Sequence, residues 1–179
     1  MTRCFIALEL PEEAKKEIIQ IQENLEKRNL FKGKLTEREN LHLTLKFLGE
    51  IDEVKIEEIR KRLKEIKFES FKAYLGEAGI FSPDFIKIVW IELLGKEIFE
   101  LQKQIDEKLS GLFEKERRFM SHITIARVKQ VKDKRKLLDY LSSIKAKQIE
   151  FPVFELVLKK SVLTEKGPIY TDIERYNLD

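Results

Sequence analysis

Apolar and polar residues follow two different periods along this chain, and these periods predict strands and helices in turn. Segments in which apolar residues alternate with polar ones, or run together over the length of a strand, predict β-strands. These segments are 3–10, 41–48, 69–81, 86–93, 122–128, 149–164 and 168–176. Gly49 is expected to end the second of them, and EKGP (165–168) is expected to form a turn between the last two.

Four other stretches carry apolar residues at the spacing of a helix face. The first begins after Pro11, the second after Asp52, which is expected to cap it, the third after Gly95, and the fourth spans 133–144. The apolar faces of the first three are Ala14, Ile18, Ile21 and Leu25; Ile56, Ile59, Leu63 and Ile66; and Ile98, Leu101, Ile105, Leu109 and Leu112.

The predicted elements follow a similar order in the two halves of the chain. Each half begins with strand and helix in alternation and ends in further strands, and no Ser/Gly-rich linker separates the halves. We therefore expect an α+β protein whose two lobes share one sheet system, with residues 1–179 forming a single bilobal domain.

Composition adds limits on function. The chain has 179 residues, 42% of them hydrophobic, and its 35 Lys and Arg nearly balance 32 Asp and Glu, giving a net charge of +3. This excludes a strongly basic DNA-binding domain but tolerates an anionic ligand. With one cysteine no disulfide can form within the chain, and no apolar run approaches the length of a membrane span. We expect a cytoplasmic protein with no signal peptide and no membrane partner.

Both histidines of the chain lie in the same short pattern. LHLTLKF (41–47) and SHITIAR (121–127) each contain His, an aliphatic residue, Thr and a second aliphatic residue. Because residues i and i+2 of a strand point to the same face, His42 and Thr44 should share one face, and so should His122 and Thr124. If the two strands are neighbours, two imidazoles and two hydroxyls converge on one cleft.

These groups suit metal-free cleavage of a phosphodiester. Imidazole has a pKa of about 6.5, so one ring can act as base and the other as acid near neutral pH. The threonine hydroxyls can donate hydrogen bonds to phosphate oxygens. A metal site is not expected, because the chain has no cysteine pair and no His-x-x-x-His, and neither motif contains a carboxylate. No cofactor is expected either.

The directions of two charged residues in these segments depend on whether each strand is regular. Arg127 lies five residues after His122, so an ideal strand would turn its side chain away from the cleft, and only a bulge or a strand end would bring it back. Lys46 has the same parity as His42 and is expected on the cleft face as a solvated lysine.

Four segments resemble the RNA 2′,3′-cyclic phosphodiesterases, also called 2′-5′ RNA ligases, of the two-histidine phosphoesterase superfamily. They are RCFIALELP (3–11), NLHLTLKFLGEI (40–51), SHITIAR (121–127) and VLTEKGPIYTDI (162–173). The resemblance implies two pseudo-symmetric lobes of antiparallel sheet with flanking helices and a central groove. It also implies hydrolysis of an RNA 2′,3′-cyclic phosphate to a 2′-phosphate, which some relatives accompany with 2′-5′ joining of RNA ends.

By the same resemblance, the catalytic pair is His42 and His122, and the substrate-binding residues are Thr44, Thr124, Arg127, Phe5 and Tyr170. A core role for Phe5 competes with this interpretation. We take His122 as the base and His42 as the acid, although the reverse assignment fits the sequence equally well.

The expected partner is RNA with a 2′,3′-cyclic phosphate end, such as a tRNA fragment, bound by a monomer. The basic clusters at 114–118 and 131–136 are either solvated or follow an RNA backbone. Two other functions stay open: a module that binds RNA ends or nucleotides without turnover, and a phosphodiesterase for another cyclic phosphate or a 2′-5′ oligonucleotide.

Overall fold

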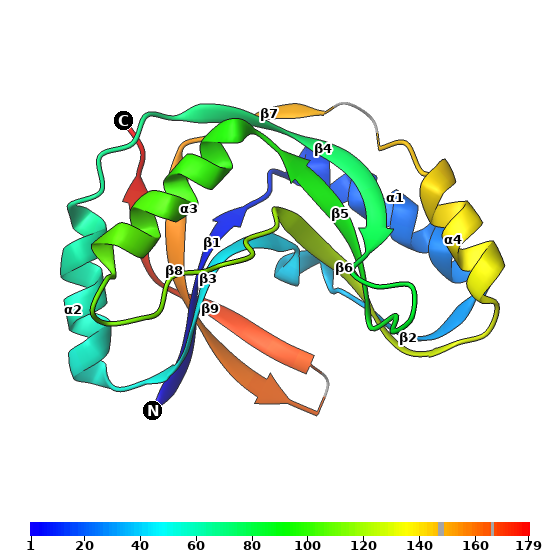
Figure 1. The fold of residues 1–179 in the computed structure, drawn as a ribbon, viewed down its shortest axis with the longest axis horizontal. Helices are drawn as coiled ribbons and strands as arrows, with labels where there is room; N and C mark the ends of the chain where they lie inside the picture. Colours follow the sequence, from blue (N-terminus) through cyan, green and yellow to red (C-terminus); the bar gives the residue numbers. More distant parts are fainter. Residues whose placement is uncertain (147–148, 166) are drawn as a thin grey trace.

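The structure, a computed structural model, describes residues 1–146, 149–165 and 167–179. Its strands are β1 (Thr2–Glu9), β2 (Phe31–Leu35), β3 (His42–Ile51), β4 (Phe71–Ile80), β5 (Ile88–Leu94), β6 (His122–Val131), β7 (Glu150–Val153), β8 (Glu155–Thr164) and β9 (Gly167–Asn177). Its helices are α1 (Glu12–Arg28), α2 (Glu53–Lys64), α3 (Lys96–Lys108) and α4 (Lys134–Ser143), with a short 3₁₀ turn, η1 (Arg38–Asn40). Figure 1 shows α1 and α4 near one end of the molecule and α2 and α3 near the other.

The helices begin where the sequence predicts them. Asp52 caps α2, since its side chain accepts a hydrogen bond of 2.8 Å from the Lys55 N–H, and Gly95 directly precedes α3. The predicted apolar faces are buried, except that Leu112 is half-buried beyond the end of α3. The period of apolar residues therefore identified which side of each helix packs against the sheet.

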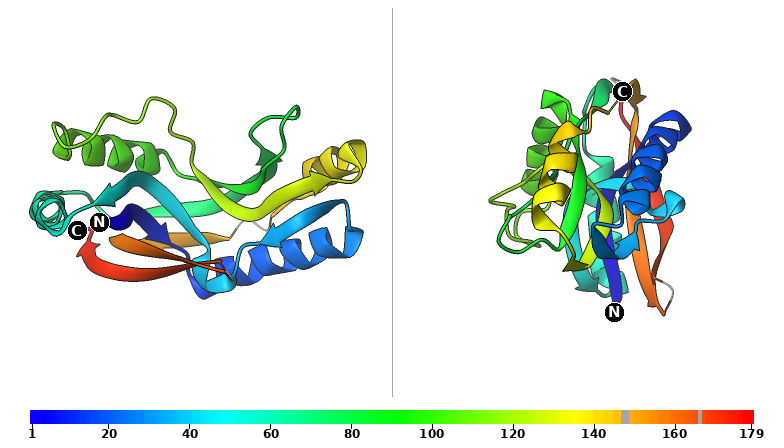
Figure 2. Two further views of the ribbon diagram at one scale, coloured as in Figure 1. Left: turned by 90° about the horizontal axis from the view of Figure 1, so that it is seen from below. Right: turned by 90° about the vertical axis from the view of Figure 1, so that its right-hand side faces the viewer.

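The strands of the described chain form one antiparallel sheet with the order β7-β4-β5-β6-β3-β1-β8-β9, and β2 also pairs with β6. Two groups of strands meet where β3 and β6 pair through Leu43 and Ile123, which follow the two histidines. The sheet curls, so that β4, β5 and β6 form one layer and β1, β8 and β9 another in the left view of Figure 2. The predicted α+β class with antiparallel lobes and flanking helices is confirmed.

Each histidine strand contains a bulge at the same place. In β3, Thr44 lies opposite Ala7 but Lys46 lies opposite Ile6, so Leu45 is an extra residue. In β6, Thr124 lies opposite Trp90 but Ala126 lies opposite Val89, so Ile125 is the extra residue. Because a bulge reverses the alternation of side chains, the residues that follow it change face up to the next irregularity of the strand.

This reversal overturns one prediction and resolves another. Lys46 does not share the face of His42: its side chain is buried, 6% exposed, and pairs with Asp106 on α3. The prediction of a solvated lysine on the cleft face was wrong, because it assumed an uninterrupted strand. The equivalent bulge in β6 turns Arg127 toward the face of His122. Of the two directions considered for Arg127, the structure thus shows the one that needs a bulge.

Two strand boundaries and one whole strand also differ from prediction. Gly49 does not end β3, which continues to Ile51. A second register irregularity of this strand lies just before Gly49, between the residues that pair with Phe5 and Cys4. Gly49 has a φ of 70°, a backbone conformation that favours glycine. The predicted strand 149–164 is interrupted at Phe154, so β7 pairs with β4 while β8 pairs with β1. The short strand β2 was not predicted. The expected turn at 165–168 includes position 166, which lies outside the described residues.

Among the helices that the structure describes, none combines the length and the apolar content that crossing a bilayer requires.

Candidate active site

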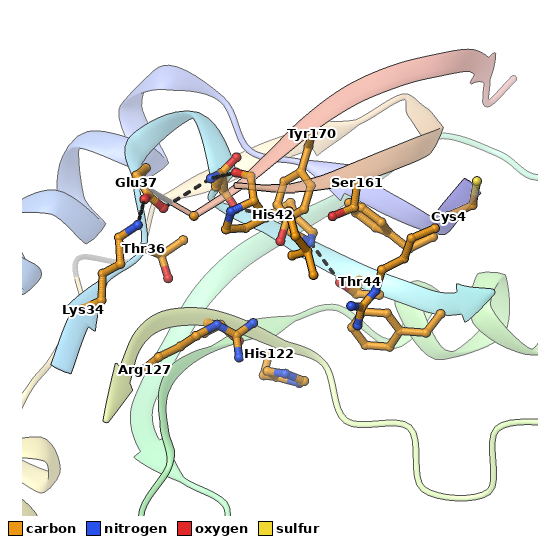
Figure 3. Close-up of a pocket in the computed structure, with 18 of the residues that line it drawn as sticks. Cys4, Lys34, Thr36, Glu37, His42, Thr44, His122, Arg127, Ser161 and Tyr170 are labelled. Atoms are coloured by element: carbon orange, nitrogen blue, oxygen red, sulfur yellow. Dashed lines mark hydrogen bonds and ion pairs between the residues drawn. The ribbon is translucent and has the colours of Figure 1, made fainter. Parts of the chain in front are cut away.

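A pocket of about 570 Å³ lies where the two histidine strands meet. Its described lining comes from β1, β2, β3, β6, β8 and β9 and from the segment 36–40. Every residue predicted as a site residue lines it: Phe5, His42, Thr44, His122, Thr124, Arg127 and Tyr170. The chain therefore brings both His-x-Thr motifs to one cavity, as the close-up in Figure 3 shows for His42, Thr44 and His122.

The ring of each histidine is oriented by a backbone carbonyl two residues earlier. His42 Nδ1 lies 2.7 Å from the Asn40 carbonyl oxygen, and His122 Nδ1 lies 2.8 Å from that of Met120. A carbonyl oxygen can only accept a hydrogen bond, so each Nδ1 carries a proton and is the donor. In a neutral ring Nε2 is then an acceptor, and His42 Nε2 lies 2.9 Å from the Thr44 hydroxyl oxygen. Both rings thus have the tautomer that a general base needs.

Both imidazoles are shifted toward the neutral form. Burial lowers the pKa of His42 to about 4, and although the hydrogen bond to the Asn40 carbonyl opposes this, the nearby Lys159 cation adds to it. Burial also lowers the pKa of His122, against the effect of the Met120 carbonyl. In the free protein at neutral pH both rings are therefore uncharged.

Aromatic rings hold the two imidazoles. The Phe5 ring centroid lies 5.0 Å and the Tyr170 centroid 5.2 Å from that of His42, the Tyr170 ring edge-on. On the other side, Phe81 meets His122 edge-on at 4.9 Å. Phe5 is only 3% exposed, so it lines the pocket mainly as packing behind His42 and offers little surface to a ligand.

An ionic network lies on the strands beside His42. Lys159 of β8 is buried and its ammonium lies 2.6 Å from a Glu9 carboxylate oxygen and 2.5 Å from one of Asp172. Arg175 joins the same two carboxylates. Since Glu9 is the register partner of His42, this network ties β1, β8 and β9 together next to the ring.

Two guanidinium groups line the pocket without a counter-ion. Neither Arg3 nor Arg127 makes a hydrogen bond or an ion pair through its side chain with any described residue, whereas Arg38, Arg60 and Arg175 are all ion-paired. Unpaired cations in a concave site favour an anionic ligand.

Several lining residues were not predicted from the sequence. Phe47 is 71% exposed and lines the pocket, because the bulge in β3 turns it inward as the bulge in β6 turns Arg127. It lies five residues after His42, the same offset that separates Arg127 from His122, so this repeated offset was a signal for it. Arg3 shares its strand face with Phe5, which was a second signal. The sequence contained no such signal for Lys34, Thr36 and Ser161.

Among the residues that the structure describes, no three His, Cys, Asp or Glu side chains are grouped as ligands of a metal ion would be. The side chains that line the pocket include two imidazoles, the hydroxyls of Thr44 and Thr124, and the guanidinium groups of Arg3 and Arg127. Such a set can bind an anion and move protons on either side of it.

Comparison with known proteins agrees with this arrangement. The model of the protein family described as LigT like Phosphoesterase matches residues 8–90 and 92–170 of the chain. The chain is 41% identical over 179 residues to the RNA 2′,3′-cyclic phosphodiesterase of Methanocaldococcus jannaschii, covering 97% of this chain and 99% of the relative. It is 34% identical to the protein of the same name from Methanothermobacter thermautotrophicus, covering 98% of each.

The fold is also found among solved structures. The crystal structure of TT0787 of Thermus thermophilus is similar with a TM-score of 0.82 and 24% identity, covering 98% of this chain and 97% of that one. The curled sheet is therefore common to both molecules.

Proposed function

The chain belongs to the LigT-like phosphoesterase family, and from this membership we propose that it hydrolyses the 2′,3′-cyclic phosphate at the end of an RNA to a 2′-phosphate. The names of its relatives support this substrate class. The observation that carries the proposal is the convergence of both histidines and both motif threonines on one pocket.

In the proposed reaction the cyclic phosphate lies between the two rings. The hydroxyls of Thr44 and Thr124 donate to its non-bridging oxygens, and Arg127 balances its negative charge and the charge that develops in the transition state. His122 Nε2 removes a proton from water as the water oxygen bonds to phosphorus. The bond from phosphorus to O3′ breaks, and His42 gives its proton to O3′.

This scheme requires one ring to be protonated in the complex. Since both rings are neutral in the free protein, a proton must be taken up with the anionic substrate, whose charge raises the pKa of a neighbouring imidazole. The carbonyl of Asn40 stabilises a charged His42 by accepting a hydrogen bond from its Nδ1–H. The reverse assignment of acid and base uses the same groups.

The test is turnover of adenosine 2′,3′-cyclic phosphate in excess EDTA, with the product identified as 2′-AMP or 3′-AMP. We expect 2′-AMP, undiminished by the chelator. His42→Ala and His122→Ala should each lower the rate roughly 10²–10⁴-fold, the usual contribution of one general acid or base.

The other outcomes point elsewhere. Tight binding without turnover would make the protein a binding module, and inhibition by EDTA would require a metal. Turnover restricted to ADP-ribose 1″,2″-cyclic phosphate or to 2′-5′ oligoadenylate would keep the chemistry but change the substrate.

We further propose that residues 1–179 act as one domain and as a monomer in the cytoplasm, on RNA ends such as tRNA fragments. The pocket draws on both halves of one chain, which supports a site that is complete without a second copy. Joining of RNA through a 2′-5′ bond would follow if a 5′-hydroxyl replaced water as the nucleophile.

A further inference from the structure

The pocket extends to both sides of the histidine pair, and its two sides differ in chemistry. Figure 3 shows Lys34, Thr36 and Glu37 on one side of His42, and Ser161 and Cys4 on the other. Arg127 lies toward the side of Lys34 and Thr36. A cyclic phosphate between the two rings would leave both sides for the rest of the substrate.

The charged side, formed by Lys34, Thr36 and Arg127, is held in place by hydrogen bonds with α1 and β6. The Thr36 N–H donates to the carbonyl of Ile125, the bulge residue of β6, at 2.9 Å. Gln22 of α1 donates from its amide to the carbonyls of both Thr36 and Ile125. The bulge that directs Arg127 into the pocket is thus bonded to the segment that carries Thr36.

The charged side also has donors to offer. The Thr36 hydroxyl makes no hydrogen bond with any described residue. Lys34 pairs with Glu37, which also accepts a hydrogen bond from Asn40 at 3.2 Å. Because Lys34 and Glu37 offset each other, the unpaired Arg127 and Arg3 give the pocket two net positive charges, which match the cyclic phosphate and one upstream phosphate.

The opposite side is formed by Phe47, Arg3 and Ser161. Phe47 is 71% exposed, although it lines the pocket. Arg3 and Ser161 are register partners on neighbouring strands. An exposed aromatic ring with a guanidinium and a hydroxyl nearby provides a stacking surface and donors for the edge of a base.

The structure of a nucleotide matches this division. In a ribose whose 2′ and 3′ oxygens form the cyclic phosphate, the base leaves from C1′ and the 5′ chain leaves from C4′, at opposite ends of the ring. When the cyclic phosphate lies between the histidines, the base and the upstream chain therefore point to opposite sides of the pocket.

We propose that the charged side, Lys34, Thr36 and Arg127, binds the phosphate on the 5′ side of the terminal nucleotide while the terminal base stacks on Phe47. This inference rests on the proposed function and deepens it. It makes an RNA end, with at least one upstream phosphate, a better substrate than a nucleoside cyclic phosphate.

The experiment compares adenosine 2′,3′-cyclic phosphate with the same compound carrying a 5′-phosphate, which adds only the group in question. The expected result is a kcat/KM at least about tenfold higher with the 5′-phosphate, since hydrogen bonds to charged groups contribute about 1.5–3 kcal/mol and 1.4 kcal/mol is tenfold. This ratio should fall as salt rises, because it depends on charge.

Variants locate the effect. Lys34→Ala and Thr36→Val, the second of which removes only the hydroxyl, should each bring the ratio toward one. Lys32→Ala is the matched control: Lys32 is an exposed lysine of the same strand that does not line the pocket, and its loss should leave the ratio unchanged. Because each variant is judged by a ratio of two substrates, a loss of folded protein cancels.

The inference is overturned if the wild-type protein hydrolyses both compounds with equal kcat/KM, or if Lys34→Ala and Thr36→Val leave the ratio unchanged. It is also overturned if Phe47→Ala removes the advantage and Lys34→Ala does not, since the substrate would then lie in the opposite direction. If neither compound is hydrolysed, it is the proposed function that fails.

Discussion

At the scale of single residues, the two histidines are matched in their surroundings. Each donates from Nδ1 to the carbonyl of the residue two positions earlier, and each contacts an aromatic ring edge-on. Each pKa is lowered by burial. These features place a neutral Nε2 acceptor on both sides of the proposed phosphate position, so the base is ready in the free protein while the acid gains its proton with the substrate.

The lowered pKa values predict an acidic optimum. The base must be neutral, so activity is lost as pH falls below its pKa. The acid must be protonated, so activity is lost as pH rises above its pKa. Because kcat/KM reports the free enzyme, and one pKa is about 4 while the other lies below its ordinary value, kcat/KM should be greatest below about pH 6.5.

The measurement is kcat/KM for adenosine 2′,3′-cyclic phosphate across the acidic and neutral range. The pH profile of kcat, which reports the complex, should lie at higher pH because the bound anion stabilises the charged ring. A maximum of kcat/KM above neutral pH would contradict the burial of the two rings.

At the scale of elements, the bulge in each histidine strand determines what enters the pocket. The bulge residue Ile125 is held by the Thr36 N–H and by Gln22, so the bend belongs to a bonded structure and not to a loose strand. Beyond it, β2 packs closely on β6: a Cβ at Gly33 would collide with the carbonyl oxygen of Arg127. Glycine at this position thus allows β2 to approach the strand that carries Arg127.

Gly33→Ala should therefore destabilise the protein and disturb the site. The colliding atom belongs to the backbone, so β2 or β6 must move, at a cost of about 1–3 kcal/mol in the free energy of unfolding. Displacement of Arg127 should also lower kcat/KM. The measurements are the denaturant midpoint and turnover of the cyclic phosphate.

Gly76→Ala is the matched control for this change. Its Cβ would come within 2.9 Å of the Glu92 carboxylate and 3.0 Å of Leu94, both side chains that can move. It should cost less stability and leave turnover nearly unaltered. An equal loss in both variants would show that crowding at Gly33 has no special role.

At the scale of the whole molecule, a buried ion pair links the two halves. Lys46 of β3 donates to Asp106 of α3 and, at 2.8 Å, to the carbonyl of Glu114. Asp106 also accepts from the Glu116 N–H at 2.9 Å. The strand of the first histidine thus anchors the segment that leads into the strand of the second, and both partners are 6% exposed in their side chains.

Removing one partner of this pair should be costly. Asp106→Leu leaves the Lys46 ammonium buried without a counter-ion, and such changes cost about 3–5 kcal/mol. The double variant Lys46→Met/Asp106→Leu removes both charges and should recover much of that loss. The free energy of unfolding from denaturant titration tests both.

An exposed ion pair is the control. Lys72 and Glu150 lie 2.7 Å apart with side chains 70% and 53% exposed, so Lys72→Met should leave stability nearly unchanged. If the double variant at Lys46 and Asp106 were no more stable than Asp106→Leu, the cost would come from lost packing and not from the unpaired charge.

The sequence alone determined the local features of this protein. The 3.6-residue and two-residue periods located the helices and most strands, because they depend on neighbours a few positions apart. The repeated His-x-Thr pattern identified the residues that converge on the pocket, because i and i+2 share a face in any strand.

Only the tertiary structure decided how the two motifs meet and what surrounds them. The bulges at Leu45 and Ile125 are defined only by pairing with other strands. The burial of Lys46 and the inward direction of Phe47 therefore could not be derived from the alternation of side chains along a regular strand. Strand β2 forms, and Lys34 lines the pocket, only because β6 pairs with this segment from about ninety positions away in the chain. The lowered pKa values likewise arise from burial, which is the joint effect of segments that are distant in sequence and adjacent in space.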